Sequence, residues 1–328
     1  MHSVDFSGKK VLVTGGAGFI GSNLVKKLLE LNAKVVVLDN FETGKMSNIE
    51  PFFSNPDFQL IEGDIRLYET CLKALEGCDS VSNQAALGSV PRSIATPDIT
   101  HSVNATGFLN MLHAAHEQSV KRFVYASSSS VYGDSQVSPK TIGSEGNLLS
   151  PYAVTKKLNE DYAKVYYRLH NLETIGLRYF NVFGPNQDPH GVYAAAIPKF
   201  IEKLTTGQEV TIHGDGNQTR DFTFVENAVK ANVLALSTNT TNAYGGVYNV
   251  ACGMYYSLND VISIIKKNLE EFGVLHPDHQ VIHGPERPGD IRDSLADIQL
   301  TEAHLGYTEP VPFEEGMLSY LSSIFVRD

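Results

Sequence analysis

The segment KVLVTGGAGFIG, residues 10–21, decides the fold of this chain. Its apolar, β-branched first half is typical of a buried strand. The glycines that follow allow a tight turn and let the backbone come close to a bound pyrophosphate. Residues 22–31 carry apolar side chains at helical spacing, and the N-terminus of such a helix attracts anions. Strand, glycine turn and helix in this order predict the first unit of a dinucleotide-binding fold.

A second apolar run, residues 34–38, ends at Asp39, which lies 18 residues beyond Gly21. An acid at this distance is suited to accept hydrogen bonds from the ribose hydroxyls of an adenosine. Its negative charge would repel the 2′-phosphate of NADP. We therefore expect NAD as the cofactor.

Strand and helix patterns alternate through the first half of the chain, which predicts an α/β fold with a doubly wound parallel Rossmann sheet. The expected strands cover residues 58–62, 80–83, 122–126 and 174–178, and the expected helices cover 68–76, 101–118 and 151–170.

The alternation loosens after residue 186. Further helices are expected at 194–206, 225–237, 258–269, 297–305 and 313–322, with strands at 209–212 and 247–251. We expect an NAD-binding domain formed by residues 1–182 and about 223–252. A smaller C-terminal α/β substrate lobe would contain about 183–222 and 253–328.

Composition narrows the class of protein. The 328 residues carry a net charge of −11 and no basic tract, so nucleic acid and anionic membranes are poor candidate partners. Three cysteines, Cys71, Cys78 and Cys252, form no C-x-x-C pair and fit a reducing compartment. The chain shows neither a signal-peptide pattern nor an apolar run long enough to span a bilayer, so we expect a cytoplasmic protein.

The segment YAVTK, residues 152–156, begins 24 residues after Ser128. A tyrosine and a lysine four positions apart share one face of a helix. Ser150 and Pro151 are typical of a helix start, so Tyr152 should lie near a helix N-terminus. The nearby ammonium and the helix dipole should both favour the phenolate and lower the pKa of Tyr152. We predict that Tyr152 is a proton acceptor and donor.

Four motifs, taken together, resemble the extended short-chain dehydrogenase/reductase family over essentially the whole chain. Three resemble its nucleotide-sugar enzymes in general: ASSSSVYG (126–133), SPYAVTK (150–156) and RYFNVFG (178–184). The fourth, QAALGSVPRS (84–93), is similar to bacterial UDP-N-acetylglucosamine 4-epimerases and to relatives acting on the uronic acid. One departure is Asn83, where many members carry histidine.

The resemblance implies a role for each site residue. Tyr152 would be the acid/base, Lys156 would hold the nicotinamide ribose, and Ser128 would hydrogen-bond the reacting sugar oxygen. The NAD site would comprise Gly15, Gly18, Phe19, Ile20, Asp39, Asn40, Gly44, Asp64, Ile65, Gln84, Ala85, Ala86, Asn104, Ser127, Tyr152, Lys156 and Tyr179.

The substrate would meet residues from both halves of the chain. They would be Gly88, Ser89, Ser128, Ser129, Ser130, Asn181, Gln187, Ala195, Thr211, His213, Arg220, Arg287, Asp290 and Ser294. Arg220 and Arg287 would hold the diphosphate and Asp290 the uridine ribose. The resemblance also implies a homodimer formed through helices such as 101–118 and 151–170, and we assign no metal ligands.

The serine run favours a 4-epimerase that works through a 4-keto sugar. Related 4,6-dehydratases carry an acid pair where this chain has Ser129 and Ser130, and related decarboxylases carry glutamate at the position of Ser130. Ser294 stands where epimerases confined to unacetylated sugars commonly carry a bulky aromatic residue. We therefore expect UDP-N-acetylglucosamine and UDP-N-acetylgalactosamine as substrates, with UDP-glucose and UDP-galactose as further candidates.

Two kinds of alternative stay open. Within the class, the substrate could be UDP-glucuronate or UDP-N-acetylglucosaminuronate. More distant alternatives are a nucleotide-sugar dehydratase and a non-catalytic NAD-binding protein on the same fold. Such non-catalytic proteins often lose one residue of the tyrosine–lysine pair, and this chain has both.

Overall fold

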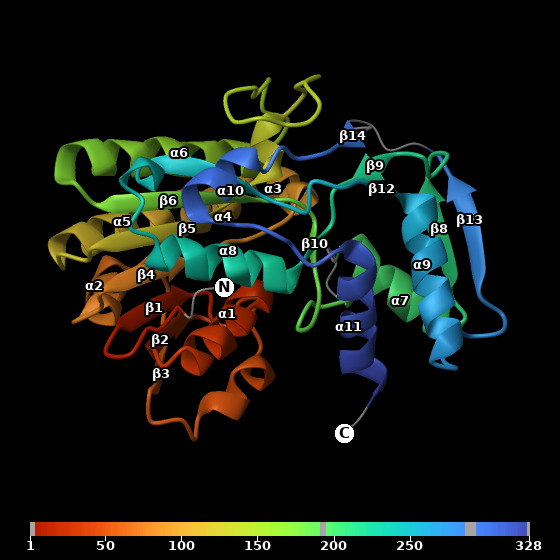
Figure 1. The fold of residues 1–328 in the computed structure, drawn as a ribbon, viewed down its shortest axis with the longest axis horizontal. Helices are drawn as coiled ribbons and strands as arrows, with labels where there is room; N and C mark the ends of the chain where they lie inside the picture. Colours follow the sequence, from red (N-terminus) through yellow and green to blue (C-terminus); the bar gives the residue numbers. More distant parts are fainter. Residues whose placement is uncertain (1–3, 191–194, 286–292, 327–328) are drawn as a thin grey trace.

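The computed structural model describes residues 4–190, 195–285 and 293–326 (Figure 1). Its centre is a seven-stranded parallel sheet in the order β11-β6-β5-β4-β1-β2-β3, so the predicted doubly wound sheet is confirmed. The strands are β1 (Lys10–Thr14), β2 (Lys34–Asp39), β3 (Phe58–Glu62), β4 (Ser80–Asn83), β5 (Arg122–Ser128), β6 (Glu173–Tyr179) and β11 (Gly246–Val250).

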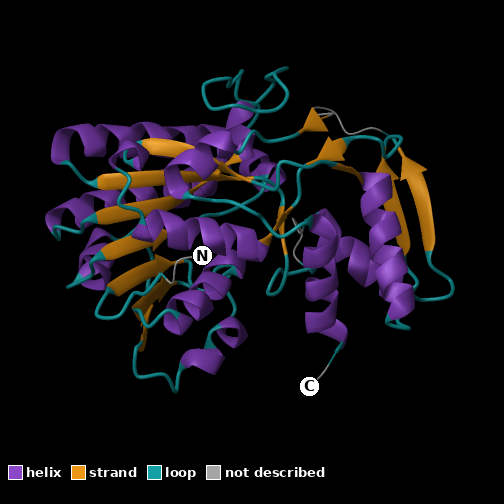
Figure 2. Ribbon diagram, viewed as in Figure 1, coloured by secondary structure: helices purple, strands orange, loops and turns teal. Residues whose placement is uncertain are grey.

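Helices cover both faces of this sheet (Figure 2). On one face lie α1 (Phe19–Glu30) and α8 (Val225–Ser237); on the other lie α2 (Tyr68–Leu75), α5 (Phe108–Glu117) and α6 (Pro151–His170). Val11 and Val13 of β1 pack in one core and Leu12 packs in the other. Successive side chains of a strand point to opposite faces, so burial on both sides explains the unbroken apolar run of β1.

The helix expected at residues 101–118 is interrupted. The chain forms α4 (Pro97–His101), a π-helical segment η3 (Ser102–Gly107) and then α5. At Gly107 a side-chain Cβ would come within 2.6 Å of Ile65, so the close approach of this segment to the loop after β3 requires glycine. A short helix, α3 (Val90–Ala95), precedes α4 and was not predicted. Single π-helical turns often occur at functional sites.

The smaller lobe has its own apolar core, formed by α7 (Ala196–Thr206), α9 (Leu258–Glu271) and α11 (Phe313–Phe325). Beside them, β8 (Glu209–His213) pairs in parallel with β13 (Gln280–Gly284). The strand β13 was not predicted, because its side chains alternate only between exposed and half-buried positions and carry a weak apolar pattern.

Short elements connect the sheet and the lobe. They are β7 (Val182–Phe183) paired with β10 (Thr223–Phe224), and β9 (Thr219–Arg220) between β12 (Tyr256–Ser257) and β14 (Asp293–Ser294). Isolated helical turns are η1 (Met46–Asn48), η2 (Glu50–Phe52), η4 (Ser129–Tyr132) and η5 (Thr241–Ala243).

One helix lies on the other side of the predicted domain boundary. The sequence places residues 253–328 in the substrate lobe, but α10 (Gln299–Leu305) packs against β11 and α8. Leu305 and Tyr307 are buried in the core of the main sheet. The chain therefore returns from the lobe to the sheet after β14 and leaves it again before α11. Among the helices of residues 4–190, 195–285 and 293–326, none has the length and apolarity of a bilayer span.

Candidate active site

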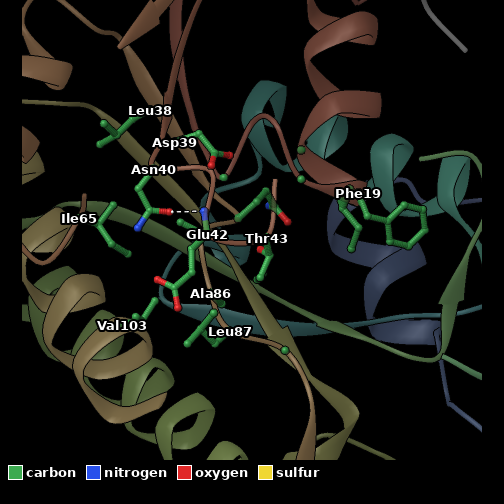
Figure 3. Close-up of a pocket in the computed structure, with 18 of the residues that line it drawn as sticks. Phe19, Leu38, Asp39, Asn40, Glu42, Thr43, Ile65, Ala86, Leu87 and Val103 are labelled. Carbon is green, nitrogen blue, oxygen red and sulfur yellow. Dashed lines mark hydrogen bonds between the residues drawn. The ribbon is translucent and has the colours of Figure 1, made fainter. Parts of the chain in front are cut away.

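A cavity of about 300 Å³ lies at the carboxyl ends of the central strands, where a doubly wound sheet binds its ligand (Figure 3). The glycine turn after β1 and the loops after β2, β3 and β4 form its walls. Residues predicted to bind NAD that line it are Gly15, Gly18, Phe19, Ile20, Asp39, Asn40, Asp64, Ile65, Gln84, Ala85, Ala86, Ser127, Tyr152, Lys156 and Tyr179. Gly88, predicted to meet the substrate, lines it as well.

The glycine turn depends on the absence of side chains. Gly15 has a φ of +66°, and a Cβ there would come within 2.8 Å of the Ala85 backbone. A Cβ on Gly21 would lie 2.1 Å from the Gly15 carbonyl oxygen. Gly18 is the N-cap of α1 and provides no side-chain cap. The first N–H groups of α1 are therefore suited to bind an anion such as a pyrophosphate.

Asp39 stands at the end of β2, buried beside the glycine turn. Its Oδ2 accepts a 2.9 Å hydrogen bond from Ala17 N, and its Oδ1 accepts a 2.8 Å bond from Phe41 N. Burial raises the pKa of Asp39, and these N–H donors act in the opposite direction. Gly44 does not line the cavity. A Cβ there would lie 3.0 Å from Asp39 Oδ1, so glycine allows the loop to close over this carboxylate.

Asn104, predicted to contact NAD, does not line the cavity either. Its side chain is buried in η3, where Oδ1 accepts from Leu87 N at 2.7 Å and Nδ2 donates to Leu87 O at 3.1 Å. Both polar ends of the amide are thereby bound to the loop after β4. Asn104 fixes the position of Leu87, which does line the cavity.

The three predicted catalytic residues come from two neighbouring elements. Ser128 ends β5, while Tyr152 and Lys156 lie on the first two turns of α6. Ser150 caps α6 by accepting a 3.1 Å hydrogen bond from Ala153 N, and Pro151 is the first helical residue, as predicted. The Lys156 Nζ lies 5.7 Å from the centre of the Tyr152 ring.

The electrostatics of this pair differ from the prediction. Burial raises the pKa of Tyr152, and a hydrogen bond with Ser128 opposes the shift. Burial also lowers the pKa of Lys156 to about 8, and its Nζ donates to the Ala126 carbonyl at 2.9 Å. The expected lowering of the tyrosine pKa by the lysine is therefore not seen. The ammonium is bound to the strand backbone, and desolvation of the phenolate has the larger effect.

A buried ion network supports the site and was not predicted. Ser127 Oγ donates to Glu160 Oε1 at 2.6 Å. The same carboxylate accepts two 2.8 Å hydrogen bonds from Arg178, whose Nη1 also pairs with Glu145. Arg178 is 2% exposed, so this bidentate pair is shielded from water. A charged residue inside the apolar strand of residues 174–178 was the signal that could have indicated it.

A second cavity of about 240 Å³ lies between β7 and the lobe. Four residues predicted to bind substrate line it: Asn181, Gln187, Ala195 and Arg220. Beside it, Ser294 of β14 pairs in parallel register with Arg220 of β9. The strand ladder thus brings Ser294 next to a residue that is 74 positions earlier in the chain.

Other predicted substrate residues line neither cavity. Ser89 caps α3 by accepting from Arg92 N at 3.3 Å. Ser129 and Ser130 lie in η4, where Ser130 N donates to Ser128 Oγ at 3.1 Å. Thr211 and His213 lie on β8, with the His213 ring 3.2 Å from Pro285 O. Arg287 and Asp290 lie outside the described residues.

Sequence reasoning missed several residues that line the first cavity. They are Gly21, Leu38, Glu42, Thr43, Gly63, Leu87, Val103 and Ala126. Glu42 and Thr43 belong to the same loop as Asp39 and Asn40, and Glu42 N donates to Asn40 Oδ1 at 3.1 Å (Figure 3). Their position directly after the β2 carboxylate was the signal that could have found them.

Known proteins are similar to this chain over most of its length. Residues 11–251 match the NAD dependent epimerase/dehydratase family. UDP-glucose 4-epimerase of Mycolicibacterium smegmatis is 35% identical over 311 residues, which cover 94% of this chain and 96% of the relative.

Two solved structures are similar over nearly the whole chain. The UDP-N-acetylglucosamine 4-epimerase from Methanobrevibacter ruminantium M1, in complex with UDP-N-acetylmuramic acid, is 37% identical with a TM-score of 0.89. The match covers 97% of this chain and 98% of that protein's chain. The UDP-glucuronic acid 4-epimerase from Bacillus cereus, in complex with UDP-glucuronic acid and NAD, is 31% identical with a TM-score of 0.87 and covers 96% and 98%.

The sheet, the glycine turn and the tyrosine–lysine pair define a Rossmann-type enzyme of the extended short-chain dehydrogenase/reductase class. The chain belongs to the NAD dependent epimerase/dehydratase family, and its cofactor is NAD.

Proposed function

We propose that this protein interconverts UDP-N-acetylglucosamine and UDP-N-acetylgalactosamine by inverting C4 of the sugar. The coarser function, an NAD-dependent UDP-sugar 4-epimerase and hence an isomerase, is supported by the family and by the relatives. The observation that carries the finer proposal is the position of Ser294. Ser294 is in strand register with Arg220, and Arg220 lines the second cavity.

The residues of the chain divide the chemistry between them. Tyr152 takes the proton of the C4 hydroxyl and later returns a proton to the oxygen at C4. Ser128 hydrogen-bonds that oxygen, and Lys156 holds the nicotinamide ribose. When bound, NAD would supply the hydride acceptor and donor for C4, and its positively charged nicotinamide would favour a phenolate in the same site. Such a charge favours the phenolate that burial of Tyr152 otherwise opposes.

The residues beside Ser128 support an epimerase over an elimination enzyme. Loss of the C6 hydroxyl would need an acid and a base for C5 and C6. Ser129 and Ser130 occupy the adjacent turn, and neither carries a carboxyl group. This arrangement supports proton and hydride transfer at one carbon, with no net oxidation.

The charges at the two cavities support an uncharged sugar. Among the described residues that line them, Lys156 and Arg220 are the cationic side chains. Lys156 is assigned to the nicotinamide ribose and Arg220 to the diphosphate. A C6 carboxylate would need a further cation, whereas a 2-acetamido group needs only room. Small side chains at Ala195 and Ser294 leave such room.

A substrate panel tests the proposal. The purified protein is incubated separately with UDP-N-acetylglucosamine, UDP-glucose and UDP-glucuronate, and the sugar is followed by NMR. The galacto product should form from the acetylated sugar, with slower or equal turnover of UDP-glucose. Turnover of UDP-glucuronate without turnover of the acetylated sugar would favour the uronic acid alternative, to which the Bacillus cereus relative is similar.

We also propose a homodimer formed through α6 and the neighbouring helices. Val154, Val165 and Leu169 of α6 are exposed apolar residues at near-helical spacing, and Ile94 of α3 and Ile99 of α4 are also exposed. Such a stripe is typical of a helix that packs against a partner. Light scattering coupled to size exclusion should give twice the chain mass, and Leu169→Glu should reduce it. A monomeric wild type would contradict the dimer.

A further inference from the structure

Asp221 is a fully buried carboxylate between two residues of the second cavity, Arg220 and Phe222. Its side chain is held by backbone N–H groups. Oδ1 accepts from Cys252 N at 3.0 Å, and Oδ2 accepts from Gly253 N at 3.0 Å and from Ala296 N at 3.3 Å. These bonds offset the cost of removing a carboxylate from water.

The backbone of Asp221 adds two contacts with predicted substrate residues. Its N–H donates to Ser294 O at 2.8 Å, and its carbonyl accepts from Asn181 Nδ2 at 2.9 Å. One residue therefore joins its own β9–β10 connection to Asn181, to the loop after β11 and to the segment after β14.

Each of these four segments is a place where the chain passes between the main sheet and the lobe (Figure 1). After β6 the chain enters the lobe at Asn181, and after β9 it returns to α8. It leaves the sheet again after β11 and returns from β14 to α10. Asp221 lies in one of these passages and hydrogen-bonds to the other three.

We propose that Asp221 is a positioning residue for the nucleotide-sugar site. Its carboxylate fixes the loop after β11 and the segment after β14 at Ala296, while its backbone holds Asn181 and Ser294 beside Arg220. The inference rests on the proposed UDP-sugar substrate, because it assigns Arg220 to the diphosphate. An apolar side chain would fill the same volume but would accept no hydrogen bonds. A carboxylate with fixed N–H donors also sets the directions in which the segments leave it.

The contact of Asp221 with the loop after β11 distinguishes a positioning role from direct packing of Asp221 against a cavity. Residues 251–255 line neither cavity, yet Cys252 and Gly253 donate to Asp221. Replacing one carboxylate oxygen by an NH₂ group, as in Asp221→Asn, would leave at least one of these N–H groups facing another donor. The segments should then shift, and the diphosphate should lose well-aligned partners.

The test measures UDP binding to the NAD-loaded Asp221→Asn variant by calorimetry. The dissociation constant should rise about tenfold or more, while kcat at saturating substrate and NAD content stay within about threefold. Ile265→Ala is the matched control. Ile265 is buried in the lobe core away from both cavities, so its loss should lower stability and leave UDP affinity within about threefold. Wild-type affinity in Asp221→Asn would overturn the proposal.

A measurement on the wild type covers the case in which the variant does not fold. Hydrogen exchange of NAD-loaded protein is compared with and without UDP. Peptides covering 251–255 should gain protection together with those around Asn181 and Arg220. Protection confined to cavity-lining peptides would overturn the role of Asp221. Failure of the proposed function gives a different result: UDP binds, but UDP-N-acetylglucosamine is not epimerised.

Discussion

The ammonium of Lys156 donates a 2.9 Å hydrogen bond to the backbone carbonyl of Ala126, two residues before Ser128 on β5. This bond ties the second turn of α6 to the strand that carries the serine. Because Lys156 is 3% exposed and burial lowers its pKa to about 8, the side chain acts within a desolvated site. The relation between α6 and β5 therefore depends on a side chain that we also assign to the nicotinamide ribose.

Replacing Lys156 by methionine should therefore affect both cofactor binding and turnover. Methionine fills a similar volume but cannot bond Ala126 O or a ribose hydroxyl. We expect less NAD to copurify with Lys156→Met and kcat to fall by about 10²-fold. NAD content is measured after denaturation, and Lys157→Met on the exposed face of α6 is the control. Full NAD content with unchanged kcat would contradict the role of Lys156.

Removing the hydroxyl group of Tyr152 should slow the proton-transfer step and leave ligand binding unchanged. Tyr152→Phe keeps the ring, so UDP binding and NAD content should stay close to wild type. The rate constant kcat should fall by about 10²–10⁴-fold, the usual contribution of a positioned general acid/base. Steady-state kinetics with UDP-N-acetylglucosamine give the value. Epimerase activity within about threefold of wild type would show that another group moves the proton.

Enlarging the side chain beside Arg220 should change substrate choice. Ser294→Tyr would fill the space that we assign to the acetamido group. Its kcat/KM for UDP-N-acetylglucosamine should fall about tenfold or more, while that for UDP-glucose falls less. Ser294→Ala is the matched control and should retain both activities. Equal loss on both sugars would mean that Ser294 does not select between them.

Breaking the buried ion network should destabilise the fold. Glu160→Gln removes the charge that pairs with Arg178 and leaves Glu145 as its anionic partner. Because Glu145 still pairs with the guanidinium, we expect the unfolding free energy to fall by about 1.5–3 kcal/mol, the usual contribution of hydrogen bonds to a charged group. Urea unfolding gives this difference. Asp161→Asn, in an exposed pair with Lys157, should cost less than about 1 kcal/mol. Equal losses of unfolding free energy in the two variants would show that the buried network contributes no more to stability than an exposed ion pair.

Affinity for the nucleotide sugar should depend on pH through Asp221. Burial raises the pKa of Asp221 to about 7, so the carboxyl is ionised above that pH and protonated below it. Protonation places an O–H among N–H donors, so the dissociation constant of UDP-N-acetylglucosamine should rise several-fold from about pH 8 to about pH 6. Calorimetry measures it, and Asp221→Asn should show no such rise.

Three acidic groups near Asp221 do not titrate in this range. The Cys252 thiol has a pKa raised to about 12, and the pKa values of Tyr256 and Tyr307 are raised further, so all three stay neutral. An arginine guanidinium keeps its charge throughout this range. Histidine is the side-chain type that commonly changes charge near neutral pH, and His213 lies on β8. His213→Gln is therefore the control, and loss of the pH dependence in that variant would assign it to the histidine.

The main sheet and the first cavity could be predicted from local patterns. The glycine turn, the Asp39 carboxylate and the α6 cap each depend on residues close together in the chain. The π-helical turn at Asn104 could not be predicted, because it depends on contacts with Leu87 and Ile65. The strand β13 was missed because its half-exposed residues carry a weak apolar period.

The sequence by itself determined the Rossmann unit, the NAD preference and the tyrosine–lysine pair, because each follows from the periodicity or spacing of residues within one or two elements. Tertiary structure alone placed Ser294 beside Arg220 and gave Asp221 its partners on three other segments. It also decided that burial raises the pKa of Tyr152. Burial and long-range hydrogen bonds depend on the packing of distant segments, which no local pattern of residues records.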